Sequence, residues 1–196
     1  MTSTSTSTST GATARTGVPA PSQHLPARLH HNAHVVKDQR ETQRFYEGVL
    51  GFPLIATWTE VDELMGAERT YCHTFYGLAD GSALAFFQFA DPADQEQFEP
   101  RFRPSPFLHI ALQVDADTQD ELTRRLTGSG WAHQVIDHGY CVSLYATDPD
   151  GLQLEFTRDH PDAERINVER RAKAHADLDR WLGGDHSSNN PFRSES

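Results

Sequence analysis

The sequence predicts an α+β fold of two similar βαβββ modules, arranged as a half-open barrel, with one added helix near the C-terminal end. Three observations lead to this prediction. Strand and helix patterns follow one another in the same order twice, short motifs recur at equivalent places in the two halves, and a helical pattern follows the second half. At 196 residues the chain is long enough for two small modules that share a core.

The first module is expected at residues 27–90. Alternating polarity and β-forming residues predict a strand at 29–36. A helix should follow from 40 to 50, because Phe45 and Val49 form one apolar face and Gly51 is a typical helix stop. The remaining predicted elements are strands at 53–61, 70–78 and 82–89, a polar stretch at 62–69 and a turn at 79–81.

The second module is expected at residues 107–160, after a proline-containing linker at 91–106. It repeats the order of the first module, with a strand at 107–114, a helix at 118–126 and strands at 131–136, 140–147 and 152–158. An amphipathic helix is predicted within 161–183. The Thr/Ser-rich segment 1–26 and the polar segment 184–196 lack apolar periodicity, so we expect them to be disordered tails.

The repeat can be followed residue by residue. Two pairs of segments align: LHHNA at 29–33 with FLHIA at 107–111, and DGSALAF at 80–86 with DGLQLEF at 150–156. This alignment places His31 opposite His109, and Ala85 opposite Glu155. A duplicated unit therefore carries two histidines at equivalent positions and a carboxylate in one half only.

Strand alternation decides which side chains face the inside of the barrel, called here the concave face. The residues on either side of His109 belong to an apolar set that should lie under the helix, so His109 points to the concave face, and by the repeat so does His31. Glu155 has the same orientation, because its neighbours Leu154 and Phe156 are apolar. One strand histidine alone is usually structural, and a Glu near a turn is usually solvated. Two imidazoles and one carboxylate on one face are typical of non-haem Fe(II) oxygenases.

Two further histidines are candidates for catalysis. Tyr145 lies on the concave face of its strand, and His73 has the matching orientation in the first module. His138 lies in the turn before the Tyr145 strand. Histidine titrates near neutral pH, so His73 and His138 are candidate acid–base groups, with a rim or packing role as the alternative for each.

Composition excludes several classes of protein. The formal net charge is −11 and no basic face is evident, which argues against nucleic-acid partners. No apolar run approaches the about 20 residues of a membrane span, and no secretory signal is recognisable. The cysteines, Cys72 and Cys141, form neither a metal-type pair nor a disulfide framework. We therefore expect a cytoplasmic protein without membrane association.

The sequence resembles the vicinal oxygen chelate superfamily, which includes glyoxalase I, extradiol dioxygenases, fosfomycin-resistance enzymes and bleomycin-resistance proteins. The resemblance covers about residues 29–158, in the stretches LHHNAHVVKDQRETQRFYEGVLGFPL, GLADGSALAFF, FLHIALQV and YATDPDGLQLEF. It implies the same fold and a metal held by His31, His109 and Glu155. Tyr145 stands ten residues before Glu155, where extradiol dioxygenases carry a substrate-directed tyrosine. Ala85 stands where glyoxalase-like members have a second carboxylate.

These implications favour an Fe(II)-dependent dioxygenase that acts on a small aromatic or enolic substrate chelated through vicinal oxygens. Its partners would be that substrate and O₂, and we expect a homodimer. A first alternative is a glyoxalase-like lyase, isomerase or thiol transferase that uses Ni, Zn, Co or Mn. A second is a protein that sequesters a drug or other ligand without turnover.

Overall fold

The computed structural model describes residues 25–99, 105 and 107–192. Of the two expected tails, residues 1–24 and 193–196 lie outside the described residues, as does most of the second half of the expected linker. In the described part of the chain, no helix is long and apolar enough to cross a membrane.

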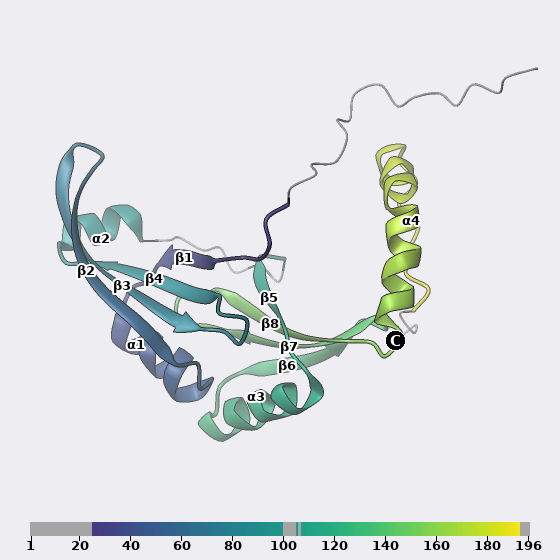
Figure 1. The fold of residues 1–196 in the computed structure, drawn as a ribbon, viewed down its shortest axis with the longest axis horizontal. Coiled ribbons are helices and arrows are strands. Elements are labelled where there is room, and N and C mark those ends of the chain that lie inside the picture. Colours follow the sequence, from purple (N-terminus) through teal and green to yellow (C-terminus); the bar gives the residue numbers. More distant parts are fainter. Residues whose placement is uncertain (1–24, 100–104, 106, 193–196) are drawn as a thin grey trace, which may run out of the picture.

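Two four-stranded sheets form the body of the molecule (Figure 1). The first has the order β1-β4-β3-β2 and the second β5-β8-β7-β6; β1–β4 and β5–β8 pair in parallel, and the other pairs are antiparallel. The strands are β1 (His31–Val35), β2 (Leu54–Leu64), β3 (Ala67–Gly77), β4 (Ala83–Phe89), β5 (His109–Gln113), β6 (His133–Asp137), β7 (Cys141–Thr147) and β8 (Gln153–Asp159).

Helical segments complete each module and extend the chain. They are α1 (Gln39–Gln43), which continues as the π-helix η1 (Arg44–Val49), then α2 (Pro92–Phe98), α3 (Ala116–Ser129) and α4 (Ala163–Leu182). The predicted α+β fold with two βαβββ modules and a C-terminal helix is confirmed, and the two sheets do not close into a barrel. Helix α2 occupies part of the expected linker, because Asp91 caps it and Pro92 suits the first helical turn.

Local sequence signals explain where the main helices begin and end. Asp38 accepts a hydrogen bond from the backbone nitrogen of Arg40 at 2.6 Å and so caps α1. Asp115 caps α3 by accepting from the nitrogen of Thr118 at 2.8 Å. Gly130 ends α3 with a φ of 70°, a left-handed conformation that costs glycine little.

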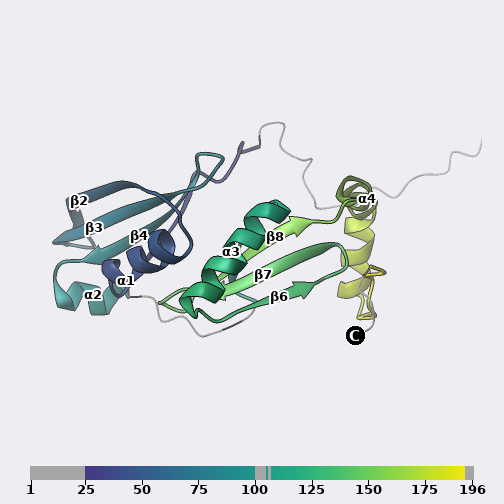
Figure 2. The same ribbon diagram turned by 90° about the horizontal axis from the view of Figure 1, so that it is seen from below.

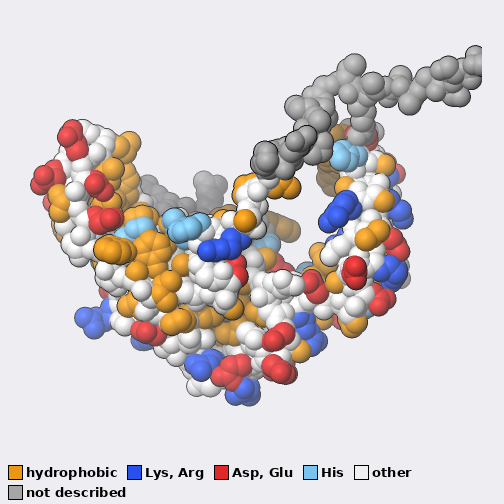
Figure 3. Space-filling view, in the orientation of Figure 1, with side chains coloured by type: hydrophobic (Ala, Val, Ile, Leu, Met, Phe, Trp, Pro, Cys, Tyr) orange, Lys and Arg blue, Asp and Glu red, His pale blue; other side chains and the backbone are white. Residues whose placement is uncertain are grey.

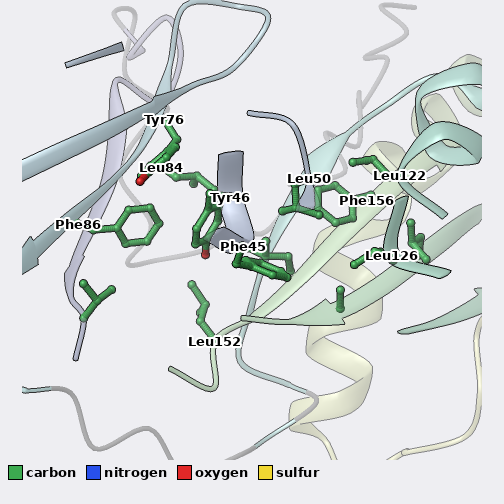
Figure 4. Packing of buried hydrophobic residues seen from close by; sticks show 14 residues of the cluster. Phe45, Tyr46, Leu50, Tyr76, Leu84, Phe86, Leu122, Leu126, Leu152 and Phe156 are labelled. Carbon is green, nitrogen blue, oxygen red and sulfur yellow. The ribbon is translucent and has the colours of Figure 1, made fainter. Parts of the chain in front are cut away.

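One hydrophobic core joins the two modules (Figure 4). Phe45 of η1 is fully buried and packs on Trp131 of the second module, with ring centroids 4.7 Å apart. Phe52 meets Phe156 at 6.2 Å. Because side chains from both modules fill the same space, the modules form a single folding unit rather than two independent ones.

The sheets present their other faces as one open concave surface. Helices α1 and α3 cover the same side of the two sheets (Figure 2), and the opposite side is hollowed between the β2–β3 hairpin and α4, with histidine side chains in the hollow (Figure 3). Leu84, Phe86, Leu154 and Phe156 all belong to the core on the helix side. The residues that alternate with these four along the same strands therefore line the concave face, as strand alternation predicts.

The β2–β3 hairpin differs from the sequence prediction. The stretch 62–69, expected as a polar connection, extends both strands and leaves only Met65 and Gly66 as the turn, with φ angles of 54° and 80°. Such left-handed pairs suit the twist of two-residue hairpins. The polar residues are compatible with strands because the end of this hairpin is exposed on both faces.

Candidate metal centre

Glu155 lies at the centre of a hydrogen-bonded cluster on the second sheet. Its neighbours across the sheet are Ala111 of β5 and Tyr145 of β7. The Oε1 atom accepts hydrogen bonds from Ser143 Oγ at 2.6 Å and from the Tyr145 hydroxyl at 2.9 Å. The Oε2 atom lies 2.8 Å from His109 Nε2. One carboxylate oxygen is thus held by hydroxyl groups, and the other meets an imidazole.

The surroundings of Glu155 keep it ionised. Burial alone would raise the pKa of this carboxyl, but hydrogen bonds from Ser143, Tyr145 and Thr157, with His109 nearby, bring its pKa below the ordinary value. Its side chain is only 10 % exposed, whereas that of His109 is 32 % exposed. A buried carboxylate beside an accessible imidazole is a donor pair suited to a divalent metal such as Zn²⁺ or Fe²⁺.

Tyr145 links this pair to His138. Burial, and then the hydrogen bond to Glu155, raise the pKa of Tyr145 to about 12, so the phenol keeps its proton at neutral pH. His138 Nε2 lies 3.0 Å from the Tyr145 hydroxyl oxygen. Because the phenol directs its one proton to Glu155, its oxygen accepts a hydrogen bond when His138 carries hydrogen on Nε2. The result is a connected series of His138, Tyr145 and Glu155.

His31 and His73 lie on the first sheet. The His31 ring is 5.6 Å from the ring of Phe75 and 6.4 Å from that of His73, and its Nδ1 is 2.7 Å from His30 Nδ1. His73 stacks on Phe87 at 3.7 Å, and its buried Nε2 has no hydrogen-bond partner within the described residues. Burial lowers the pKa of His73, Glu60 opposes this and His31 reinforces it. His73 is therefore neutral at neutral pH.

The predicted site residues thus divide between the two sheets. His109, Glu155, Tyr145 and His138 come together on the second sheet, and His31 with His73 on the first. Among the described residues of one chain, no three His, Cys, Asp or Glu side chains are grouped so that they could hold a metal ion. Within the described part of one chain, His31 is therefore not grouped with His109 and Glu155.

Two further residues shape the site. Sequence analysis did not assign a role to Ser143, and the structure shows it donating to Glu155. Its position two residues before Tyr145, and hence on the same face, was the available signal. Ala85 is fully buried between its strand neighbours Ala33 and Phe75. A methyl group therefore occupies the first-module counterpart of Glu155.

Comparison with known proteins identifies the family. The sequence model of the Glyoxalase/Bleomycin resistance protein/Dioxygenase superfamily matches residues 28–156, and the chain belongs to this superfamily. The matched range covers the first module almost completely and the second module as far as the middle of β8, and it ends before α4. Comparison with curated proteins gave no match.

Solved structures show the same fold. A glyoxylase/bleomycin resistance protein/dioxygenase domain from Frankia sp. EAN1pec is 19% identical, with 70% of this chain and 95% of that one covered and a TM-score of 0.53. A variant of FosX, a fosfomycin-resistance protein of Listeria monocytogenes solved with Mn(II) and 1S,2S-dihydroxypropylphosphonic acid, is also 19% identical. It covers 72% of this chain and 99% of its own, with a TM-score of 0.51.

Proposed function

We propose that this protein is a metal-dependent dioxygenase of the extradiol type, with His31, His109 and Glu155 as ligands of one Fe(II). The observation that carries the proposal is the contact between His109 Nε2 and Glu155 Oε2, made beside a tyrosine that donates to the same carboxylate. Two imidazoles and a carboxylate leave open positions on one side of the metal. Ala85 supplies no further ligand, which supports a metal site with three protein ligands.

We further propose that the site is completed in a homodimer. Each chain exposes His31 on the concave face of one sheet and His109 on that of the other. If two copies bring their concave faces together about a two-fold axis, His31 of one copy can meet His109 and Glu155 of the other, twice over. The shared core supports this arrangement, because it holds the two sheets of one chain side by side rather than face to face.

The remaining residues have separate tasks in this proposal. A bound metal would acidify a coordinated substrate hydroxyl and offer positions for substrate and O₂. The Tyr145 hydroxyl, fixed between His138 and Glu155, orients the substrate oxygen. His138 and the neutral His73 can each accept a proton, and the aromatic rings of Phe75 and Phe87 beside His73 form an apolar wall for a flat substrate.

The alternatives keep the same site and change the chemistry. The FosX variant was solved with Mn(II), and for this reason the second candidate is a lyase, isomerase or thiol transferase that uses Mn, Ni, Zn or Co. A ligand-sequestering protein without turnover is the third. We favour the dioxygenase because Tyr145 and the three-ligand set match the extradiol pattern together.

The test is metal analysis of protein purified without chelator, followed by oxygen uptake with catechols after anaerobic loading with Fe(II). Loading with Mn(II) or Ni(II) serves as the parallel arm, and His109→Ala protein as the control. Oxygen uptake that depends on both Fe(II) and His109 is expected. Tight metal binding without oxygen uptake would favour the lyase or transferase, and absence of metal binding would favour the sequestering protein.

The homodimer is tested by complementation. His31→Ala and His109→Ala proteins should each be inactive, because every site in either dimer lacks one ligand. Co-refolding the two should restore about a quarter of the parent activity, since half of the dimers are mixed and each has one intact site. A mixture that stays inactive while forming mixed dimers would contradict a site shared between subunits.

A further inference from the structure

Helix α4 is an addition to the family fold that stands off the two sheets. The residues matched by the superfamily end at 156, and α4 spans Ala163–Leu182. Ile166 is its only buried residue, and the helix projects away from the end of β8 (Figure 1). Because only Ile166 is buried, α4 contributes little to the hydrophobic core. Its contacts with the modules must therefore serve a purpose other than core packing.

These contacts converge on the turn between β6 and β7. The guanidinium carbon of Arg170 lies 3.8 Å from the centre of the Tyr140 ring, close enough for a cation–π contact. Asn190, in the segment that follows α4, donates from Nδ2 to the backbone oxygen of His138 at 3.3 Å. The short stretch 138–140 is therefore held at both ends by residues from outside the matched fold.

The same stretch carries the imidazole that reaches the candidate metal centre. His138 Nε2 lies 3.0 Å from the Tyr145 hydroxyl, which in turn donates to Glu155. Within the turn, the His138 nitrogen donates to the Cys141 carbonyl at 2.9 Å. That bond fixes the backbone of the turn but leaves the direction of the His138 ring open, so contacts from outside the turn can decide whether the ring stays on Tyr145.

We propose that Arg170 and Asn190 are positioning residues that hold the 138–140 turn so that His138 remains on the Tyr145 hydroxyl. The inference deepens the proposed function, because Tyr145 and Glu155 belong to the proposed site. Arg170 acts through Tyr140, and Asn190 through the backbone of His138. Neither residue touches substrate or metal.

The direct test observes the His138 imidazole in metal-free protein, by its ¹⁵N resonances at one fixed pH. Arg170→Gln, alone and with Asn190→Ala, should move these resonances, because the ring loses its fixed place beside Tyr145. Arg170→Lys should restore the parent spectrum in part, since an ammonium can also lie over an aromatic ring but does not stack on it as a planar guanidinium does. Arg171→Gln is the matched control: Arg171 is the next residue, is also exposed and, among the described residues, has no hydrogen bond, ion pair or cation–π contact with the turn. Unchanged His138 resonances in Arg170→Gln/Asn190→Ala protein would overturn the proposal.

A double-mutant cycle then tests the consequence for turnover. Arg170→Gln should lower kcat about two- to fivefold in the parent protein and leave it unchanged in a His138→Ala background. An equal loss in both backgrounds would mean that Arg170 acts by another route, and would overturn the proposed path. If no variant oxidises a catechol, the proposed function fails, and the resonance experiment still decides whether Arg170 positions His138.

Discussion

Tyr145 and Glu155 lie directly opposite each other on neighbouring antiparallel strands, and the tyrosine hydroxyl donates to the carboxylate at 2.9 Å. The tight β7–β8 turn explains their spacing in the sequence: Asp148 accepts from the nitrogens of Asp150 and Leu152 and closes the hairpin. A sequence distance of ten residues across such a hairpin places both side chains on one face. The Tyr145–Glu155 pair is therefore built on paired strands rather than on a loop.

Tyr145→Phe should retain the metal and lose most of the turnover. The change removes a hydroxyl that contacts the proposed ligand Glu155 and His138, but it removes none of the proposed ligands. Loss of such a supporting hydrogen bond typically costs about 10- to 100-fold in activity. Metal content and kcat with the same substrate, measured side by side, check this. A variant with full activity would remove Tyr145 from the mechanism.

His109→Ala should lose metal affinity by more than about 100-fold while keeping its fold. The His109 side chain is 32 % exposed and lies on the face opposite the core, so its loss leaves no core cavity. The metal content per chain, measured by mass spectrometry, tests the loss of affinity. The far-UV circular dichroism spectrum tests whether the fold is kept. His175→Ala, at an exposed histidine of α4, is the control. An insoluble His109→Ala protein would show that this residue is structural.

His73 should make the protein less stable in acid. Burial lowers its pKa in the folded state, so below the unfolded histidine value of about 6.5 the unfolded chain binds a proton that folded His73 does not. The free energy of unfolding therefore falls as pH drops from about 6.5 towards the lower folded pKa. His73→Phe keeps a ring against Phe87 and removes this titration. Urea unfolding at neutral and acidic pH should show a larger loss for the parent, and equal losses would contradict the prediction.

Phe45→Ala should destabilise both modules together. Phe45 is fully buried and contacts Trp131 across the module boundary, and such truncations cost about 3–5 kcal/mol. Unfolding should remain a single transition at lower denaturant concentration, since the modules share one core. Leu182→Ala, where the leucine is 73% exposed, should change stability by less than about 0.5 kcal/mol. Two separate transitions in the Phe45 variant would mean that the modules fold independently.

Periodicity and the internal repeat predicted the succession of strands and helices along the chain and the faces of His109, Glu155 and Tyr145, because alternation follows directly from backbone geometry. They could not predict the distance from His31 to His109. The position of a residue along a strand tells which face of its sheet it lies on, but not how one sheet is placed relative to another. The extension of the β2–β3 hairpin through 62–69 was missed because most of that stretch is exposed and polar and gives no alternating apolar pattern. The contact of Arg170 with Tyr140 joins elements whose packing has no periodic signal in the sequence.

Ala85 has a consequence for how this chain can change its chemistry. Its methyl group is fully buried between Ala33 and Phe75, so a glutamate at this position would have to displace the side chains that cover the methyl group or bury its charge. Ala85→Glu alone should give a destabilised protein rather than a four-ligand site. A smaller residue at position 75 would have to come first to make space for the carboxylate. The mutational path from three protein ligands to four is therefore at least two substitutions long, and its order is fixed by packing.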